Sequence, residues 1–444
     1  MLPHGTPCKS ELMRCKFLFF AALACLWTSP SAAQPHSSPN KITITPNHVL
    51  AIDGKPVFTI GFTSIPRPDA RTPSGKPAFE ELRDAGALML RTGPMQRIDG
   101  PRGPSWNDDW IDRERRYMDA AARAGMYCMP WLQELAELGP DQPEQEEQLR
   151  RVIRTFREHP GMGIWKGDDE PQWARQSVDP LVRVYGVIKH EDPNHPVWIV
   201  QAPRGTVDEL RAYNPTYDIG GVDLYPIGYP PGRHLAEGAT NCHMSMIGDY
   251  TKKMLQVVDH KKPIWLTLQI SWSGVANPGK TLRFPTFPEQ RFMTYQAIIN
   301  GARGLVYFGG GFTSTLPDQD KPYGWNWTHW RRVLRPVIEE IGDKSPLAAA
   351  LCAPDAKLPV EAAGNDVELC VREVGDDVFI LACCRNPEKT AEVRFTGLPP
   401  EIGDGQVLYE SPRKVTAEDG AFTDWFAPFE VHVYRFTRSK PKES

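Results

Sequence analysis

The stretch MGIWKGDDEPQWARQSVDPLVRVYGVIKHEDPNHPVWIVQ, residues 162–201, decides the fold. It begins with a short apolar run, Met162–Gly167, which predicts a buried strand. Apolar residues then recur at the spacing of one face of an α-helix: Leu181, Val184, Tyr185 and Ile188. A second apolar run, Pro196–Gln201, predicts another strand. Strand, helix and strand in this order are typical of a parallel β-sheet.

The same alternation extends on both sides of this unit. Six more apolar runs predict strands: Val57–Phe62, Ala87–Arg91, Met126–Trp131, Ile219–Tyr225, Pro263–Gln269 and Gly304–Gly309. Helical spacing recurs over 149–156 and 330–341. Eight strands that alternate with helices predict an α/β fold, a (β/α)8 TIM barrel. The alternative, an open doubly wound sheet, normally has a glycine-rich turn after its first strand, whereas Gly54-Lys55-Pro56 precedes that strand here.

The pattern changes near Leu351. Beyond this point no helical spacing is found in the sequence, and short apolar runs are separated by Gly, Pro, Asn and Asp. The runs are Val367–Val371, Val378–Ala382, Ala391–Phe395, Val407–Tyr409 and Glu430–Phe436. They predict a small antiparallel β-sandwich over 351–444, after a barrel over 34–350. Near the N-terminus, Ile42–Thr45 and Val49–Ile52 predict a strand pair that closes the barrel floor.

Residues 1–33 have the order of a secretory signal peptide. Positively charged residues precede the apolar run Phe17–Trp27, and the small residues Ser31-Ala32-Ala33 follow it. The run is shorter than the roughly 20 apolar residues that span a bilayer, so no stable membrane span is predicted. The sequence therefore predicts a secreted or periplasmic protein.

Composition and motifs exclude several classes of partner. The chain has 444 residues, 51 Lys and Arg against 55 Asp and Glu, and a formal net charge of -4. Nucleic-acid binders need a basic surface, so nucleic acid is not a predicted partner. His234 and His243 share a loop with Cys242, but their spacing is not that of a metal site. Gly309-Gly310-Gly311 lacks the Lys-Ser/Thr of a phosphate loop, and no cofactor is predicted.

Three acids, Asp168-Asp169-Glu170, follow the fourth predicted strand directly and precede Pro171. In barrel enzymes the catalytic residues lie at the carboxyl ends of the strands. Glycoside hydrolysis needs one carboxylic acid to protonate the leaving oxygen and a second carboxylate to stabilise or attack the cationic centre. The acid cluster therefore favours this chemistry. The alternative is that the acids cap the next helix and pair with Arg175 or Lys166.

Other strand ends carry residues that suit sugar binding. Arg91 ends the second strand, and its guanidinium is suited to a sugar hydroxyl or a uronate carboxylate, with a salt bridge at the barrel mouth as the alternative. Amides and aromatic rings at other strand ends complete the predicted substrate-binding set: Trp131, Gln201, Tyr225, Gln269 and Trp272. Three further tryptophans lie in nearby loops: Trp173, Trp325 and Trp327. Apolar faces of sugar rings stack on such aromatics, although each aromatic alone is more often part of a core.

Several motifs in the chain resemble the clan A glycoside hydrolases, which combine a (β/α)8 barrel with a C-terminal β-sandwich. The matching pieces are Asp53-Gly54-Lys55-Pro56, Asp169-Glu170-Pro171, Gly221-Val222-Asp223-Leu224-Tyr225-Pro226 and Met293-Thr294-Tyr295-Gln296-Ala297. The resemblance covers roughly residues 42–438 and implies activity on a poly- or oligosaccharide. It also implies that Glu170 is the general acid/base, and Asp169 stands where the clan most often has Asn.

The chain departs from the clan at strand seven. The resemblance places a nucleophilic Glu at this strand end, but the chain has Gln269, whose neutral amide cannot act as a nucleophile. Asp223 at the end of strand six is then the favoured second carboxylate, either as nucleophile or as the base of an inverting mechanism. Two non-enzymatic alternatives stay open. One is a barrel that binds carbohydrate without cleaving it, and the other is a cell-envelope protein that interacts through its sandwich.

Overall fold

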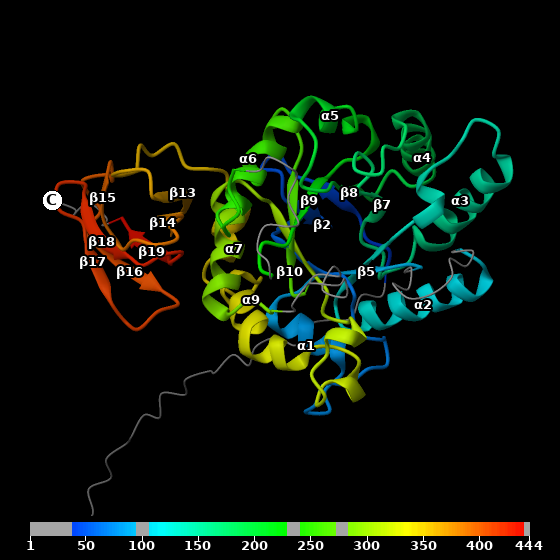
Figure 1. Cartoon of the computed structure of the whole chain (residues 1–444), viewed down its shortest axis with the longest axis horizontal. Helices are drawn as coiled ribbons and strands as arrows, with labels where there is room; N and C mark the ends of the chain where they lie inside the picture. Colours follow the sequence, from blue (N-terminus) through cyan, green and yellow to red (C-terminus); the bar gives the residue numbers. More distant parts are fainter. Residues whose placement is uncertain (1–37, 95–105, 229–239, 272–282, 439–444) are drawn as a thin grey trace, which may run out of the picture. The chain divides into compact units, whose positions relative to one another are not determined.

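The computed structural model describes residues 38–94, 106–228, 240–271 and 283–438. In this part of the chain, parallel strands surround an axis and helices lie outside them (Figure 1). The strands are β4 (Thr59–Phe62), β5 (Met89–Thr92), β6 (Tyr127–Pro130), β7 (Trp165–Asp169), β8 (Val197–Val200), β9 (Gly220–Leu224), β10 (Ile264–Gln269) and β11 (Gly304–Phe308). The predicted (β/α)8 barrel is confirmed. The predicted signal peptide over residues 1–33, together with His234 and Trp272, lies outside the described residues.

The strands form a closed ring. A 6-stranded sheet has the order β6-β5-β4-β11-β10-β9, and β7 pairs with β8. Single parallel bridges join the two sheets: Trp131 pairs with Lys166 beyond β6, and Gln201 pairs with Val222 beyond β8. Because the ring is closed and its strands are parallel, all their carboxyl ends meet at one mouth.

The helices follow the predicted alternation. They are α1 (Ala78–Ala85), α2 (Asp108–Arg123), α3 (Pro143–Phe156), α4 (Val178–Glu191), α5 (Val207–Arg211), α6 (Met246–Val257), α7 (Phe287–Ile299), α8 (Trp327–His329), α9 (Arg335–Ile341) and α10 (Ala348–Cys352). The segment predicted as one helix over 330–341 begins with a π-helical turn, Trp330–Leu334. This turn lies just before Pro336, which lacks the N–H that a regular α-helix uses there. None of the described helices has the length and apolar character needed to cross a membrane.

The barrel interior is filled by large side chains and is closed below by N-terminal strands. Trp198 and Trp265 lie inside the barrel, and the centroids of their indole rings are 5.8 Å apart. Any Cβ at Gly304 would lie 2.5 Å from the Trp265 indole, so only glycine leaves room for this ring. Residues of β1 (Ile42–Ile44) and β2 (Leu50–Ile52) pack in the same apolar cluster, and β3 (Lys55–Val57) completes their sheet. The predicted strand pair on the barrel floor is therefore confirmed.

The C-terminal strands form two antiparallel sheets with a core between them, which confirms the predicted β-sandwich. One sheet contains β13 (Val367–Val374), β14 (Asp377–Cys384), β16 (Asp404–Leu408), β17 (Lys414–Thr416) and β19 (Val431–Thr437). The other contains β12 (Glu361–Ala362), β15 (Ala391–Thr396) and β18 (Phe422–Phe426). The sequence patterns missed β12, β17 and β18, since these strands are short or carry polar residues between the apolar ones.

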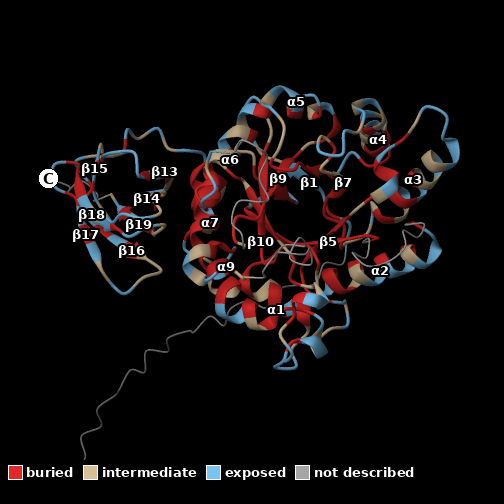
Figure 2. Ribbon diagram, viewed as in Figure 1, coloured by how far each residue is buried: buried red, intermediate tan, exposed pale blue. Residues whose placement is uncertain are grey.

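Strand β14 is buried on both faces, as Figure 2 shows by its colour. Ile380 and Ala382 belong to the core of the sandwich, whereas the alternate residues Phe379 and Leu381 belong to the large core of the barrel. A strand with both faces covered has a continuous apolar sequence instead of an alternating one. The same packing explains why Met293 and its neighbours on α7 are buried all around the helix.

Candidate active site

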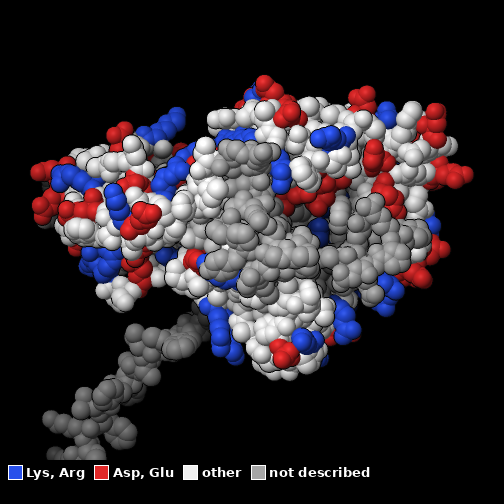
Figure 3. Space-filling model, in the orientation of Figure 1, with Lys and Arg blue, Asp and Glu red and all other residues white. Residues whose placement is uncertain are grey.

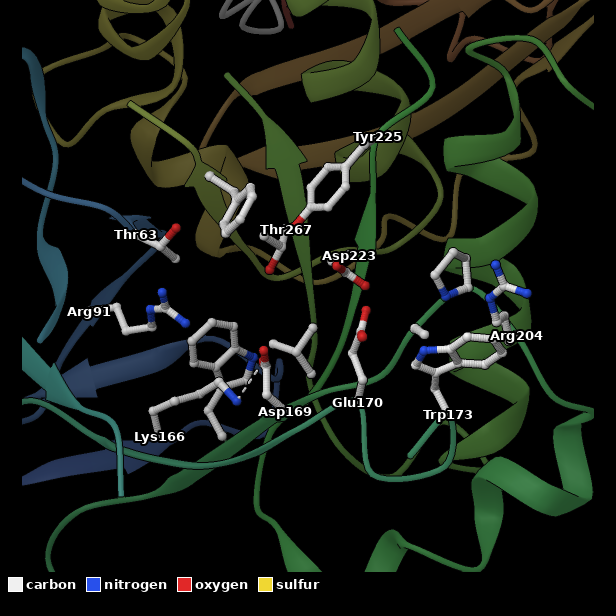
Figure 4. Close-up of a pocket in the computed structure, with 15 residues that line it drawn as sticks. Thr63, Arg91, Lys166, Asp169, Glu170, Trp173, Arg204, Asp223, Tyr225 and Thr267 are labelled. Atoms are coloured by element: carbon white, nitrogen blue, oxygen red, sulfur yellow. Dashed lines mark ion pairs between the residues drawn. The ribbon is translucent and has the colours of Figure 1, made fainter. Parts of the chain in front are cut away.

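A pocket of about 270 Å³ opens at the carboxyl ends of the barrel strands. This volume is just below the range of about 300–1,000 Å³ that is typical of sites for small molecules. Both acids and bases line it: Arg91, Lys166, Asp169, Glu170, Arg204 and Asp223. Figure 4 shows these side chains converging from several strands. On the face drawn in Figure 3, acidic side chains gather near the middle of the barrel, and basic side chains lie close to them.

An irregularity in β7 decides which of its side chains face the pocket. The pairing register between β7 and β8 shifts between Lys166 and Asp169. Without this shift, residues three apart on a strand would point to opposite faces. Because of the shift, Lys166 and Asp169 both line the pocket, whereas Asp168 lies on the outer side among Leu181 and other α4 residues. Bulges of this kind often redirect a side chain beside an active site.

The backbone at Glu170 directs a second consecutive acid into the same pocket. Glu170 has a φ of 53°, a left-handed conformation that is uncommon for a residue with a side chain. Its N–H donates to the carbonyl oxygen of Val200 at 2.7 Å, which holds the turn against β8. Residues kept in such conformations concentrate at functional sites, because the surrounding structure must hold them there. The acid cluster is thus divided: Asp169 and Glu170 face the pocket and Asp168 does not.

Asp169 is held in its ionised form. The Lys166 ammonium lies 3.0 Å from the Asp169 carboxylate, and Lys166 is fully buried. Burial by itself raises the pKa of Asp169, but the positive charges of Lys166 and Arg91 outweigh it and bring the pKa below its usual value. Burial raises the pKa of the neighbouring Asp168 to about 6. The salt bridge that the sequence offered as an alternative role for the acids is therefore present at Asp169, within the pocket.

Glu170 and Asp223 form a hydrogen-bonded pair of carboxyl groups. Figure 4 shows the two groups pointing towards each other across the pocket. Burial and the charge of Asp169 raise the pKa of Glu170. Burial and the charge of Glu170 raise the pKa of Asp223 well above its usual value. Two carboxyl groups in contact cannot both ionise easily, so the pair keeps its last proton to a higher pH than an isolated carboxyl group does.

Tyr225, the residue directly after β9, supports this pair. Its hydroxyl is hydrogen-bonded to Asp223, and its ring stacks on Phe308 with a centroid distance of 5.1 Å. Arg91 lines the opposite side and is only 8% exposed. Its guanidinium lies 4.8 Å from the Trp131 ring centroid. The pocket therefore contains three of the predicted substrate-binding or catalytic groups outside β7: Arg91, Asp223 and Tyr225.

Other predicted binding residues lie beside or away from this pocket. Both groups of the Gln269 amide are bonded to the backbone of Ile227, at 2.7 and 2.8 Å. Gln201 is buried and its oxygen accepts from the N–H of Gln172 at 3.2 Å. Trp131 lies behind Arg91 and is not part of the pocket wall. Trp325 and Trp327 are core residues that are 0% and 3% exposed.

The pocket wall also contains residues that were not predicted as site residues, among them Lys166, Arg204 and Thr267. Thr267 lies two positions before Gln269 on β10, so its side chain faces the same side of the strand one layer deeper. Arg204 follows the end of β8, and the rule that strand ends carry function would have found it. Lys166 lies inside a strand and carries no such signal. Within the described residues, no group of three His, Cys, Asp or Glu side chains is arranged to hold a metal ion.

Solved structures of glycoside hydrolases share this fold. A protein described as a glycoside hydrolase aligns with a TM-score of 0.59 at 14% identity, covering 90% of this chain and 98% of its own. A family 5 glycoside hydrolase from Bacteroides vulgatus aligns with a TM-score of 0.59 at 13% identity, covering 90% and 94%. An Anoxybacillus alpha-amylase aligns with a TM-score of 0.55 at 12% identity, covering 86% and 98%.

Comparison of the sequence with known families and proteins assigns the chain to no family. No model of a protein family matches the chain, and no curated protein matches it either. At 12 to 14% identity the structural similarity establishes the fold. The resemblance to a clan A-like barrel with a C-terminal sandwich is thus confirmed at the level of the fold.

Proposed function

We propose that the protein is a glycosidase that cleaves a poly- or oligosaccharide and uses the Glu170–Asp223 pair as its proton donor. The observation that carries this proposal is a hydrogen-bonded carboxyl pair in a small pocket at the mouth of the barrel. A carboxylic acid that stays protonated near neutral pH is what the leaving oxygen of a glycosidic bond requires. The glycoside hydrolase-like fold supports the same chemistry.

In the proposed reaction, Glu170 gives its proton to the glycosidic oxygen as the bond to the anomeric carbon breaks. The pair is left with two negative charges, one on each carboxylate, and these stabilise the positive charge that develops on the sugar ring. Water then adds to the anomeric carbon, and its proton returns to the pair. Asp169 stays ionised throughout and keeps the pKa of the pair high. Trp173, which is 53% exposed at the pocket wall, offers a flat face for a sugar ring.

The contact between Glu170 and Asp223 bears on the type of mechanism. Inverting glycosidases separate their two carboxyl groups by about 6.5–9.5 Å so that a water molecule fits between them. The carboxyl groups of Glu170 and Asp223 instead point towards each other and interact directly (Figure 4). The pair is therefore proposed to act as one proton-holding unit.

The test is a panel of polysaccharides and oligosaccharides incubated with the purified protein, followed by analysis of released reducing ends. Release of defined products from at least one member supports the proposal. Binding to a glycan without release of products would instead support a carbohydrate-binding barrel without catalytic activity. Gln269 favours this second candidate, because the strand end where the clan has its nucleophile carries an amide committed to Ile227.

Two further proposals rest on the sequence. An export signal over residues 1–33 is proposed to bring the protein to the periplasm or the medium. The proposed boundaries are 34–350 for the barrel and 351–444 for the sandwich. N-terminal sequencing of the protein recovered from its native host checks the first of these proposals.

A further inference from the structure

Arg204 is held at the wall of the pocket in a fixed orientation. It follows the end of β8, where its own N–H donates to the carbonyl of Ala202 at 2.7 Å and tightens the turn. Its guanidinium carbon lies 4.0 Å from the centroid of the Trp173 ring, so the cation stacks on the indole (Figure 4). Stacking on one face leaves the N–H groups along the edge of the guanidinium directed away from the ring.

No carboxylate is paired with Arg204 among the residues that the structure describes. Other arginines among the described residues are held by a carboxylate. Arg291, for example, lies 2.8 Å from Glu340. An arginine that is positioned by an aromatic ring, and not by an acid, keeps its capacity to bind an oxyanion in the fork geometry.

The charges of the whole pocket point in the same direction. Its cations are Arg91, Lys166 and Arg204. Asp169 offsets one of them directly, and the Glu170–Asp223 pair contributes one negative charge while it holds its proton. Counted over the described residues of the wall alone, these groups leave one positive charge in excess when the pair is in the protonation state that the proposed reaction needs. An anionic group on the ligand would balance this charge.

We propose that the pocket binds a sugar that carries an oxyanion substituent, a carboxylate or a sulfate, and that Arg204 contacts this group. The inference rests on the proposed function and names its class of substrate. It also connects binding with catalysis, because the positive charge of Arg204 lowers the pKa of Glu170 against the larger effects of burial and of Asp169. A ligand oxyanion on Arg204 offsets that charge and helps Glu170 to keep its proton.

The experiment compares three probes of equal length: neutral oligosaccharides, oligogalacturonates and sulfated galactan oligosaccharides. Affinity for each is measured by titration calorimetry with the intact protein, with Arg204→Gln and with Arg204→Lys. One charge-assisted hydrogen-bonded contact corresponds to about a ten- to hundredfold loss of affinity. We expect Arg204→Gln to show this loss for one anionic probe, Arg204→Lys to show a smaller loss, and neutral probes to be unaffected by either.

Arg394→Gln is the matched control. Arg394 is exposed on β15 and does not line the pocket, so this variant removes one positive charge without touching the site. Thermal unfolding of all variants checks that each is folded. Which anionic probe responds identifies carboxylate or sulfate as the source of the oxyanion.

The outcomes separate this inference from the proposed function. If the intact protein binds and cleaves neutral glycans as well as anionic ones, and Arg204→Gln affects all probes equally or none, the inference is wrong while the glycosidase proposal stands. If the intact protein neither binds nor cleaves any glycan of the panel, the proposed function fails and the inference fails with it. An equal loss in Arg394→Gln would show a general charge effect and would also overturn the inference.

Discussion

The carboxyl ends of β7 and β10 lie at the same mouth of the barrel, but their backbone geometry and the partners of their side chains differ. At β7, the shifted register and the left-handed φ of Glu170 direct two acids into the pocket. At β10 the pairing with β9 and β11 is regular to the end of the strand. Its last residue, Gln269, uses both groups of its amide on the backbone of Ile227.

The difference shows how hydrogen-bonding capacity separates a reactive group from a structural one. The amide of Gln269 is satisfied by the backbone, so it stabilises the segment that follows β9. The Glu170 carboxyl is bonded to another carboxyl, and such a pair exchanges protons without losing its structural support. The irregular backbone at the end of β7 therefore positions side chains that can exchange protons. The regular backbone at the end of β10 positions an amide that holds the neighbouring segment in place. Four substitutions test this contrast.

The largest effect is expected from Glu170→Gln. The amide keeps the shape of the side chain and its hydrogen bond to Asp223, but it cannot donate a proton to a leaving oxygen. Loss of a general acid typically lowers kcat by about 10²- to 10⁴-fold. We expect this decrease with little change in glycan affinity, measured by steady-state kinetics on a substrate found in the panel and by calorimetry.

The control for this variant is Glu158→Gln, since Glu158 is exposed and its side chain is 67% accessible. Both variants should unfold at nearly the same temperature as the intact protein. Turnover by Glu170→Gln equal to that of the intact protein would remove Glu170 from the mechanism and end the contrast between β7 and β10.

Lys166→Met is expected to lower the free energy of unfolding, in addition to any effect on catalysis. The change removes a fully buried ammonium 3.0 Å from Asp169 and leaves that carboxylate with only part of its compensation. Breaking a buried ion pair costs about 3–5 kcal/mol, and we expect the lower end because the Asp169 side chain is 38% exposed to the pocket. Chemical denaturation measures the free energy of unfolding.

The double variant Lys166→Met/Asp169→Asn should recover part of this loss, because it no longer contains an uncompensated carboxylate. Lys389→Met, at an exposed position of the sandwich, should leave stability within about 0.5 kcal/mol of that of the intact protein. A double variant that is as unstable as the single one would mean that Lys166 acts through packing against Trp198, 5.3 Å from its ring centroid, and not through charge.

Gln269→Glu tests the other side of the contrast. A carboxylate at this position cannot donate to the Ile227 carbonyl, and it is buried, so we expect a loss of about 1–3 kcal/mol of stability at pH 7 and no gain of activity. Burial raises the pKa of such a carboxyl in the folded state above its unfolded value. The penalty is therefore absent below the unfolded pKa and complete above the folded one. The loss should thus disappear as the pH falls.

Gln256→Glu is the matched control for this series, since Gln256 is exposed on α6 and its side chain has no described role. Denaturation curves at several pH values should superimpose for this control and the intact protein. A large gain of activity in Gln269→Glu would mean that the β10 end is a catalytic position that has lost its acid, and the contrast would be wrong.

The arrangement of the barrel was predictable because it depends on periodic patterns. The apolar runs and the helical spacing around residues 149–156 and 181–188 fix strands and helices locally. The rule that barrel chemistry lies at strand ends then selected Glu170 and Asp223. Both were predicted as site residues, and the structure brings them together in one pocket.

The fine structure of the site was not predictable, because it depends on pairing between distant residues. The register shift after Lys166 depends on β8, and the sequence of β7 alone gives no sign of it. The commitment of Gln269 to Ile227 joins residues 42 positions apart. A glutamine at a strand end has the same sequence pattern whether it faces a substrate or the backbone. Stacking of Arg204 on Trp173 likewise joins two loops that periodicity does not describe.

The smallest expected effect concerns the pH profile of Asp223→Asn. In the intact protein, the second proton of the pair leaves against the negative charge that remains on its partner, which raises the pKa of the pair. With Asn at position 223, the site has no second carboxylate whose charge opposes ionisation, so its last proton leaves at lower pH than the last proton of the pair. The acid form is then lost at lower pH, and the basic limb of the kcat/KM profile should move to lower pH by about one unit.

The direction of this shift distinguishes a proton-sharing pair from two carboxyl groups that act separately. If Asp223 were a nucleophile or the base of an inverting mechanism, its loss would lower kcat at every pH and leave the basic limb in place. A shared proton instead predicts an unchanged plateau at low pH, because Glu170 is protonated there with either partner. Since Asn can still donate a hydrogen bond to Glu170, the charge of Asp223 is the main property that the substitution removes. The pH of the basic limb of the kcat/KM profile thus measures how strongly the Glu170 carboxyl at the end of β7 and the Asp223 carboxyl on β9 influence each other's ionisation.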